Sequence, residues 1–308
     1  MEKTMTRQKS LWQAYLQAAR PFSFTASMTP VFLGAALTLR AGIPARWELF
    51  PLVVVASLLI HAATNMVSEY FDWRKGVDRP DTLGGSRVII DGLLTPRQVL
   101  TAGLLAFAAT AAIGLVFVAV HGWPILTLGL IGIAGGFFYT AAPIGFKYMG
   151  LGDLCVFWLM GPLMVVGSFF VLTGVWSFEA LAVSLPVGCL VAAILSGNNL
   201  RDIAHDAAAD VRTTAGLLGH RRAKYEYAAL VLSAYALVVL LALFSALSLW
   251  ALAVLLTLPM AVRITKAALA STPDNPDTIA ALDVQTAQTH LAFGVLLIAS
   301  VLVETWLS

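Results

Sequence analysis

Long apolar segments follow one another along the whole chain and are separated by short polar connections. Each extends for about 20 residues, the length that an α-helix needs to cross the hydrocarbon core of a bilayer. Because the segments lack the sustained alternation of barrel strands, they are predicted to be helices. Nine spans are predicted, at residues 22–40, 48–68, 98–120, 124–142, 153–174, 179–198, 226–246, 249–268 and 287–307. The expected fold class is all-α, a polytopic membrane helix bundle.

The composition also indicates a membrane protein. Of the 308 residues, 59% are hydrophobic and only 12% are charged, and the mean hydropathy is +0.84. A soluble domain of this size could not cover so much apolar surface with so few charges, so the soluble classes are excluded. The lipid bilayer is the expected surrounding, and a net charge of +2 gives no reason to expect a nucleic-acid partner.

The polar connections differ in charge between the two sides of the predicted bundle. The side that holds the N-terminus carries every Lys and Arg except Arg40 and Arg46. Because basic loops tend to remain in the cytoplasm, the N-terminus and the two long charged loops are predicted to be cytoplasmic. Residues 1–21 are predicted to form an amphipathic segment on that membrane surface, and residues 22–308 a single membrane domain.

Two polar clusters mark the cytoplasmic ends of spans two and six. Asn65, Glu69 and Asp72 are spaced by four and three residues, which places them on one helical face. The second cluster repeats the pattern in four-residue steps: Asn198, Asp202, Asp206 and Asp210. Spans two and six run in the same direction, so both clusters are expected at the same membrane surface.

Carboxylates stacked on one helical face repel one another and require a cation. Neighbouring basic residues such as Arg74, Lys75 and Arg201 could supply the positive charge, which would leave two solvated, salt-bridged helix ends. The alternative is a divalent metal. Oxygen ligands without His or Cys suit Mg²⁺, which binds carboxylates together with phosphate oxygens. The mixture of acidic and basic residues therefore indicates a Mg²⁺-dependent site for a diphosphate.

A diphosphate at the mouth of an apolar bundle points to an isoprenoid substrate. Its head would remain at the aqueous edge while its tail lies between the helices, and departure of the diphosphate would leave an allylic cation for a nucleophile. Lys147, in the loop after span four, would reach the diphosphate, or would be an interfacial lysine beside an interfacial Tyr139. Gly84-Gly85-Ser86 would wrap a phosphate or form a turn.

Several motifs resemble those of the UbiA-type intramembrane prenyltransferases. They are Arg20-Pro21, NMVSEYFDWRKGVD, LGGSRVIIDGLLTP, YTAAP followed by Lys147, NNLRDIAHD and TAQTHLAFGVLL. They extend over nearly the whole chain, and the block over residues 65–96 is too long and specific to arise by chance. Within the family, the resemblance is closest to the 1,4-dihydroxy-2-naphthoate polyprenyltransferases of menaquinone biosynthesis.

The resemblance implies helices around a central, lipid-open cavity, with Mg²⁺ as the cofactor, in a bacterial or archaeal cell membrane. Matched by position, the metal residues would be Glu69, Asp72, Asp202 and Asp206. The diphosphate would contact Arg20, Asn65, Arg87, Tyr139, Lys147, Asn198 and Arg201. The catalytic residues would be Asp72, Asp202, Asp206 and Lys147.

Two positions depart from the family pattern. Ser68-Glu69 stands where the family usually has Asn-Asp, so the first motif keeps an acid with one more methylene. Asp210-Val211 stands where the family usually has Gly-Lys, so a lysine that would bind phosphate is replaced and a carboxylate is added. Both departures concern the expected metal and diphosphate contacts.

The resemblance implies transfer of a polyprenyl group from polyprenyl diphosphate to an aromatic acceptor, 1,4-dihydroxy-2-naphthoate, with loss of CO₂ to give demethylmenaquinone. Three alternatives remain open: a related transferase with another acceptor, a terpene cyclase that acts on its own prenyl chain, and a carrier that binds the polyprenyl lipid without cleaving it. Release of pyrophosphate discriminates among them, because a carrier releases none and a cyclase releases it without an aromatic acceptor.

Overall fold

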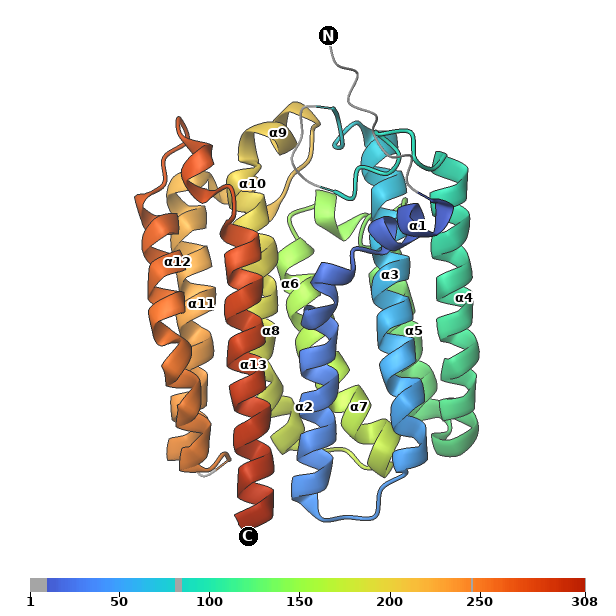
Figure 1. The fold of residues 1–308 in the computed structure, drawn as a ribbon, viewed down its shortest axis with the longest axis vertical. Coiled ribbons are helices and arrows are strands. Elements are labelled where there is room, and N and C mark those ends of the chain that lie inside the picture. The colour runs from blue at the N-terminus through green and yellow to red at the C-terminus, as the bar shows by residue number, and fades with distance from the viewer. Residues whose placement is uncertain (1–9, 81–84, 245, 308) are drawn as a thin grey trace.

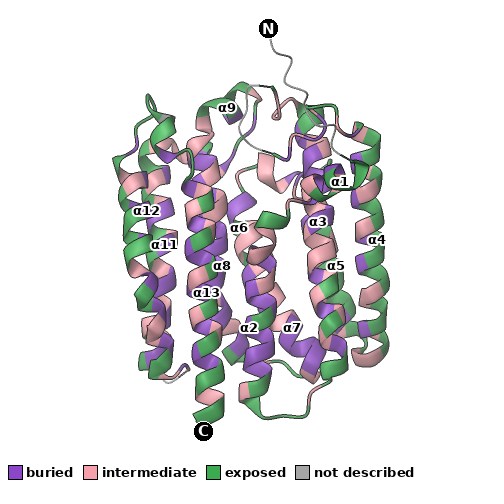
Figure 2. Cartoon of the chain, viewed as in Figure 1, coloured by how far each residue is buried: buried purple, intermediate pink, exposed green. Residues whose placement is uncertain are grey.

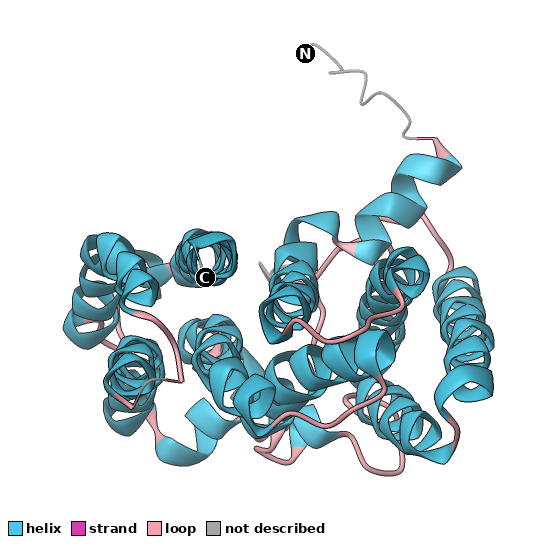
Figure 3. Cartoon of the chain, turned by 90° about the horizontal axis from the view of Figure 1, so that it is seen from below, coloured by secondary structure: helices cyan, strands magenta, loops and turns pink. Residues whose placement is uncertain are grey.

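The structure, a computed structural model, describes residues 10–80, 85–244 and 246–307. Within these residues every regular element is a helix, and the β-pairing consists of an isolated bridge between Met149 and Arg212. The long helices run side by side over the height of the molecule (Figure 1), and Figure 3 shows them end-on. The predicted all-α class is confirmed.

The elements include short 3₁₀ segments and a π-helical segment, η4, all labelled η. Their bounds are α1 (Leu11–Ala19), η1 (Pro21–Phe24), α2 (Thr25–Ala41), η2 (Trp47–Leu49), α3 (Phe50–Lys75), α4 (Pro96–His121), α5 (Trp123–Phe137), η3 (Phe146–Tyr148), α6 (Gly152–Trp158), η4 (Leu159–Leu163), α7 (Met164–Thr173), α8 (Phe178–Arg201), α9 (Ile203–Ala208), α10 (Thr214–Leu218), α11 (His220–Leu243), η5 (Leu249–Thr257), α12 (Leu258–Ala270), η6 (Pro276–Ile279) and α13 (Leu282–Leu307). α3 and α8, which carry the acidic clusters, finish at the same end of the bundle as α1 and α9 (Figure 1). We call this the charged end.

Eight helical segments of the described chain are long and apolar enough to cross a membrane. They overlap eight of the nine predicted spans. The remaining span, predicted at 124–142, corresponds to α5, which has 15 residues. A helix of that length is about 22 Å long and falls short of a bilayer core. The predicted count of nine spans is therefore not confirmed.

α3 continues beyond residue 68, where the predicted span ends, as far as Lys75. It stops at Gly76, whose φ of 76° lies in the left-handed region that glycine adopts without steric cost. The apolar sequence ends at the membrane surface, but the hydrogen bonds of the helix continue for two further turns. Asn65, Glu69 and Asp72 therefore lie on one continuous helix, as their spacing predicts.

The second acidic cluster is less regular than predicted. α8 ends at Arg201, and Asp202 (φ −96°, ψ 10°) interrupts the helix before α9 begins. Asp206 remains one turn beyond Asp202, because its N–H donates to the Asp202 carbonyl at 2.9 Å. Asp210 lies past α9 in the left-handed conformation, with a φ of 52°. The predicted helical step from Asp206 to Asp210 is therefore wrong.

α1 is a surface helix that is out of line with α2 (Figures 1 and 3). Ser10 and Gln13 close its N-terminus with a capping box. Leu11 and Trp12 are 64% and 70% exposed, which suits a helix that lies on a membrane surface. Arg20 ends α1 in the left-handed conformation (φ 54°) and turns the chain toward α2.

Glycines allow helix backbones to touch inside the bundle. A Cβ atom at Gly161 of η4 would lie 2.5 Å from the Cα of Gly188 in α8. Backbone atoms cannot move aside as the end of a side chain can, so a larger residue does not fit there. Buried residues gather on the inward faces of the helices, while exposed residues cover much of the outside (Figure 2).

Replacing Gly161 by alanine is expected to lower the apparent melting temperature in detergent by several degrees, because overpacking costs about 1–3 kcal/mol. Gly114→Ala is the matched control, since a Cβ at Gly114 has no neighbour within 4 Å. The control should melt at the temperature of the parent protein or above it. Thermal unfolding followed by tryptophan fluorescence measures both, and equal melting temperatures for the two variants would contradict the backbone contact.

Candidate active site

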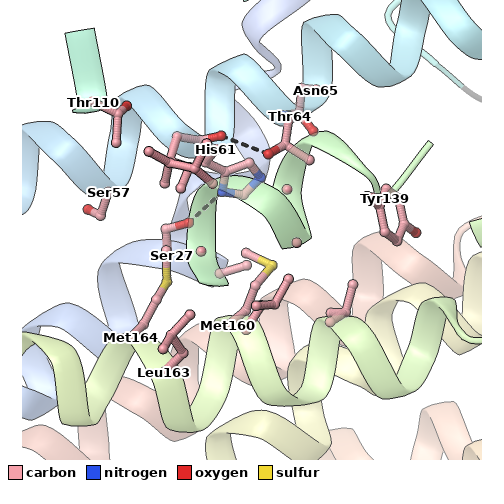
Figure 4. A pocket seen from close by; sticks show the side chains of 18 of the residues that line it. Ser27, Ser57, His61, Thr64, Asn65, Thr110, Tyr139, Met160, Leu163 and Met164 are labelled. Carbon is pink, nitrogen blue, oxygen red and sulfur yellow. Dashed lines mark hydrogen bonds between the residues drawn. The ribbon is translucent and has the colours of Figure 1, made fainter. Parts of the chain in front are cut away.

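A cavity of about 930 Å³ lies inside the bundle and reaches the charged end. Most of its wall comes from α2, α3, α4, α5, η4, α7 and α8, with residues of η1, α6 and α13 added, and consists mostly of apolar side chains. Figure 4 shows part of it, with Met160, Leu163 and Met164 on the wall that faces His61. The charged residues of its lining are Arg20, Asp72, Lys147, Arg201 and Asp283. The cavity thus suits a ligand with a charged head and a long apolar tail.

Lys147 and Asp72 form a buried ion pair at the charged end of the cavity. The Lys147 Nζ lies 2.9 and 2.8 Å from the two carboxylate oxygens of Asp72. The Tyr148 hydroxyl donates to Oδ1 of the same carboxylate at 2.8 Å. The lysine is positioned by η3, where its N–H donates to the Tyr139 carbonyl at 2.8 Å. Lys147 therefore points toward the acidic residues of α3.

Glu69 holds two other segments against α3. Its Oε2 lies 2.8 Å from the Arg20 guanidinium and accepts from the Ser86 N–H, also at 2.8 Å. Glu69 is 1% exposed, so its charge requires these partners. The longer acid at this position thereby fixes Arg20, at the joint between α1 and η1, and the start of the described segment after residue 84.

The second cluster has its own buried cation. Arg201 contacts both carboxylate oxygens of Asp202, at 2.8 and 2.7 Å, and lies 3.1 Å from the Asp283 carboxylate at the start of α13. Asn198 donates to the same Asp283 carboxylate at 3.4 Å. These contacts attach the end of α8 to α13, and they leave the Arg201 side chain at the cavity wall.

Lys147 interacts with both acidic clusters. Burial lowers the pKa of Lys147, but the neighbouring charges of Asp72 and Asp206 outweigh this effect, so the pKa is raised. Burial raises the pKa of Asp206 to about 6, and the charge of Lys147 opposes the rise. Burial, followed by the charge of Asp72, raises the pKa of Asp78 to about 7. Burial and the neighbouring carboxylates thus make Asp78 and Asp206 easier to protonate than exposed carboxyl groups, while the charge of Lys147 favours their ionised forms.

The predicted site residues differ in their relation to the cavity. Those that line the cavity are Arg20, Asn65, Asp72, Tyr139, Lys147, Asn198 and Arg201. Glu69, Asp202 and Asp206 lie behind this lining, next to the cations that belong to it. Arg87 is turned toward Asp91, which lies 3.2 Å away, and the described residues do not place it at the cavity. Gly84, a candidate for wrapping a phosphate, lies outside the described residues.

The predicted metal residues suit Mg²⁺ chemically, because the atoms that they would offer to a metal are carboxylate oxygens. In the part of the chain that the structure describes, Oε1 of Glu69 and Oδ2 of Asp78 are buried without a hydrogen-bond partner. Among the same residues, no group of three or more His, Cys, Asp or Glu side chains is close enough to hold a metal alone. A divalent cation would therefore need phosphate oxygens to complete its coordination, which is usual for Mg²⁺.

His61 lines the cavity and was not expected from the motifs. Its ring nitrogens lie 3.0 Å from the Ser23 hydroxyl and 2.5 Å from the Ser27 hydroxyl. His61 lies one helical turn before Asn65, so its place on the same helical face could have indicated that it lines the site. A search for pairs of histidines at metal-binding spacing does not find it, because it has no such partner. Tyr148 and Asp283 were also missed, because their contacts with the two clusters depend on tertiary structure.

Comparison with known proteins agrees with this architecture. The UbiA prenyltransferase family matches residues 27–283. A 1,4-dihydroxy-2-naphthoate octaprenyltransferase from Bacillus subtilis (strain 168) is 32% identical over 98% of this chain and 96% of its own length. The human UbiA prenyltransferase domain-containing protein 1 is 35% identical over 80% of this chain and 73% of its own length.

Solved structures share the fold. The apo structure of a UbiA homolog from Aeropyrum pernix K1 superposes with a TM-score of 0.69 at 18% identity, over 91% of this chain and 97% of that protein. A UbiA homolog from Archaeoglobus fulgidus, bound to GPP and Mg²⁺, has a TM-score of 0.59 at 18% identity, over 93% and 99% of the two chains. This chain therefore belongs to the UbiA prenyltransferase family and is a membrane enzyme that transfers prenyl groups.

Proposed function

We propose that the protein transfers a polyprenyl group from polyprenyl diphosphate to 1,4-dihydroxy-2-naphthoate. The observation that carries this proposal is a long apolar cavity whose charged end holds Lys147 against Asp72. The acceptor is suggested by the Bacillus subtilis relative, whose similarity extends over nearly the full length of both chains. The product after loss of CO₂ would be a 2-polyprenyl-1,4-naphthalenediol, the reduced form of demethylmenaquinone.

The basic side chains at the charged end would bind the diphosphate. Lys147 supplies a compact charge, while Arg20 and Arg201 can each offer two parallel N–H donors to phosphate oxygens. Each of the three already lies against a carboxylate, so its position is fixed before substrate enters. Binding energy is then not lost in ordering long side chains.

Asp72 at the cavity wall, with Glu69, Asp202 and Asp206 behind the lining, would hold Mg²⁺ together with the phosphate oxygens. When bound, the metal supplies stabilisation of the negative charge that develops on the departing diphosphate. Tyr148 and Lys147 hold the Asp72 carboxylate in one orientation through three hydrogen bonds. Preorganised charge of this kind lowers the barrier because it needs no rearrangement during the reaction.

The bond between C1 of the prenyl group and its diphosphate oxygen breaks, and both electrons leave with the diphosphate. The ring carbon that carries the carboxylate forms the new bond to C1, and CO₂ departs, which returns the electron pair to the ring. The apolar walls exclude water from the allylic cation, so the ring captures it in preference to hydroxide or water. Asn65, Asn198 and Tyr139, at the cavity wall, would position the substrate head.

The orientation of the chain belongs to the same proposal. The charged end would face the cytoplasm, where polyprenyl diphosphate and Mg²⁺ are available, in a bacterial or archaeal cell membrane. The distribution of Lys and Arg, which leaves only Arg40 and Arg46 on the opposite side, supports this orientation.

Purified protein in lipid, supplied with Mg²⁺ and polyprenyl diphosphate, is expected to release pyrophosphate only when 1,4-dihydroxy-2-naphthoate is present. Mass spectrometry should then detect the decarboxylated prenyl naphthalenediol. Release without the aromatic compound would indicate cyclisation or hydrolysis. Failure to release pyrophosphate with this acceptor would exclude dihydroxynaphthoate as its substrate.

Asp72→Asn and Asp202→Asn are each expected to lower turnover by at least about a hundredfold, because an amide cannot replace the charge of a metal-binding carboxylate. Asp274→Asn is the matched control, since Asp274 is exposed in the loop before η6. Size-exclusion chromatography in detergent checks that each variant is folded. Turnover of folded Asp72→Asn at the parental rate would refute the metal role of this residue.

Excess EDTA is expected to abolish turnover, and added Mg²⁺ should restore it, because carboxylates alone repel the diphosphate. The measurement is the initial rate of pyrophosphate release at fixed ionic strength. Full activity after chelation would show that Lys147, Arg20 and Arg201 are sufficient without a metal.

A further inference from the structure

The face of α3 that borders the cavity is polar far below the charged end. Ser57, His61, Thr64, Asn65 and Ser68 all contribute to the lining, and each lies three or four residues from another member, which keeps them on one side of the helix. Thr110 of α4 and Ser27 of α2 also line the cavity, in the same part as His61 (Figure 4). A polyprenyl tail consists of hydrocarbon and makes no use of such groups. They indicate a second ligand that is polar.

The hydrogen bonds around His61 determine the tautomer of its neutral ring. The Ser23 hydroxyl donates to the Arg20 carbonyl at 2.8 Å, so its oxygen accepts from Nε2 of His61, 3.0 Å away. Nε2 therefore carries the proton, and Nδ1 accepts from the Ser27 hydroxyl at 2.5 Å. The Ser27 proton is thus already committed, and its oxygen retains a lone pair for another donor.

Further hydroxyls of the wall are committed in the same way. Each donates to a backbone carbonyl three or four residues earlier: Ser57 to Val54 at 2.8 Å, Thr64 to Ile60 at 2.8 Å and Thr110 to Ala106 at 2.9 Å. Because a hydroxyl has one proton and two lone pairs, these oxygens can still accept but have no proton left to donate. We call Ser27, Ser57, Thr64 and Thr110 the lone-pair wall; His61 lies beside it and holds the Ser27 proton, so that the Ser27 oxygen can only accept.

We propose that the lone-pair wall binds the aromatic substrate through its hydroxyl groups and selects the free dihydroxy ring over the corresponding quinone or ether. The inference rests on the proposed function, because it concerns the aromatic substrate of the same reaction. A ring with two O–H groups supplies donors that match the wall. A quinone or a dimethyl ether presents only oxygen lone pairs, which would face lone pairs without a hydrogen between them.

The position of the wall suits this role. His61 precedes Asp72 by about 16 Å along the helix axis, so an aromatic ring at the wall lies on the apolar side of the diphosphate. The hydrophobic side chains opposite, Met160, Leu163 and Met164, can cover the faces of the ring (Figure 4). The hydroxyl groups are then the polar contacts that fix its orientation. A site built for hydrogen bonds rejects analogues that lack the donors, because its buried polar atoms would be left unpaired.

The test measures equilibrium binding, which does not require turnover. 1,4-Dihydroxy-2-naphthoate and 1,4-dimethoxy-2-naphthoate are bound, under anaerobic reducing conditions, to the full chain in lipid nanodiscs, and empty nanodiscs correct for partition into lipid. We expect the dihydroxy compound to bind at least about tenfold more tightly than the dimethoxy compound. His61→Leu frees the Ser27 proton and turns one acceptor of the wall into a donor, so it should reduce this ratio by at least about threefold, while the dissociation constant for polyprenyl diphosphate stays within about twofold.

His290→Leu is the matched control. His290 is a buried histidine of α13, 0% exposed, that does not belong to the cavity lining of the described chain. His290→Leu makes the same replacement away from the cavity, and this variant should leave the binding ratio unchanged. If His61→Leu does not fold, the isosteric double variant Thr64→Val/Thr110→Val replaces it, with an expected reduction of the ratio of at least about threefold.

The possible outcomes separate the two proposals. A ratio near one for the parent protein, or a ratio that both wall variants leave unchanged, overturns the role of the lone-pair wall. A large ratio that falls in His61→Leu but not in His290→Leu supports it. If that pattern appears while no prenylated product forms, the proposed reaction fails and the binding site stands. If product forms while the ratio is near one, the reaction stands and the wall does not select the hydroxyl groups.

Discussion

The ion pair between Lys147 and Asp72 lies at the charged end of the bundle, where the apolar cavity opens toward the polar residues. Asp72 is 4% exposed, and a carboxylate this buried costs several kcal/mol unless a cation and further donors compensate. The pair also determines how the chain is folded locally, because it attaches η3 to the end of α3. With Arg20 against Glu69 and Arg201 against Asp202, it explains how an apolar bundle can gather so many carboxylates at one end.

The parts of the site that the sequence predicts are those set by local geometry. Asn65, Glu69 and Asp72 share a helical face because helix periodicity alone places them there. The partner of Glu69 could not be predicted, since Arg20 is 49 residues away and reaches it only after α1 turns into α2. Asp210 was misplaced because α9 ends at Ala208, so that Asp210 lies beyond the helix and itself adopts the left-handed conformation. The length of α5 was overestimated for a similar reason, since its apolar sequence continues past the last helical residue.

α3 carries out two tasks at different depths along one rigid element. Its last turns hold the carboxylates of the charged end, and its middle turns supply Ser57 and Thr64 of the lone-pair wall together with His61 beside it. The helix has no proline between these two regions, so their separation is fixed by regular helix geometry. A leaving group and an aromatic ring could therefore be held in constant register, which favours reaction because the reacting atoms need little further ordering.

The glycine contact between η4 and α8 distinguishes a position that must stay small from neighbouring positions that tolerate other side chains. Gly161 admits no side chain, yet its neighbours Leu159, Met160 and Leu163 face the cavity and touch whatever fills it. Exchanges at those three positions would reshape the interior, while the close contact of Gly161 with Gly188 keeps η4 against α8. A lineage of such proteins can thus acquire new substrates by small replacements on a single segment, while the charged residues at the other end of the cavity stay unchanged.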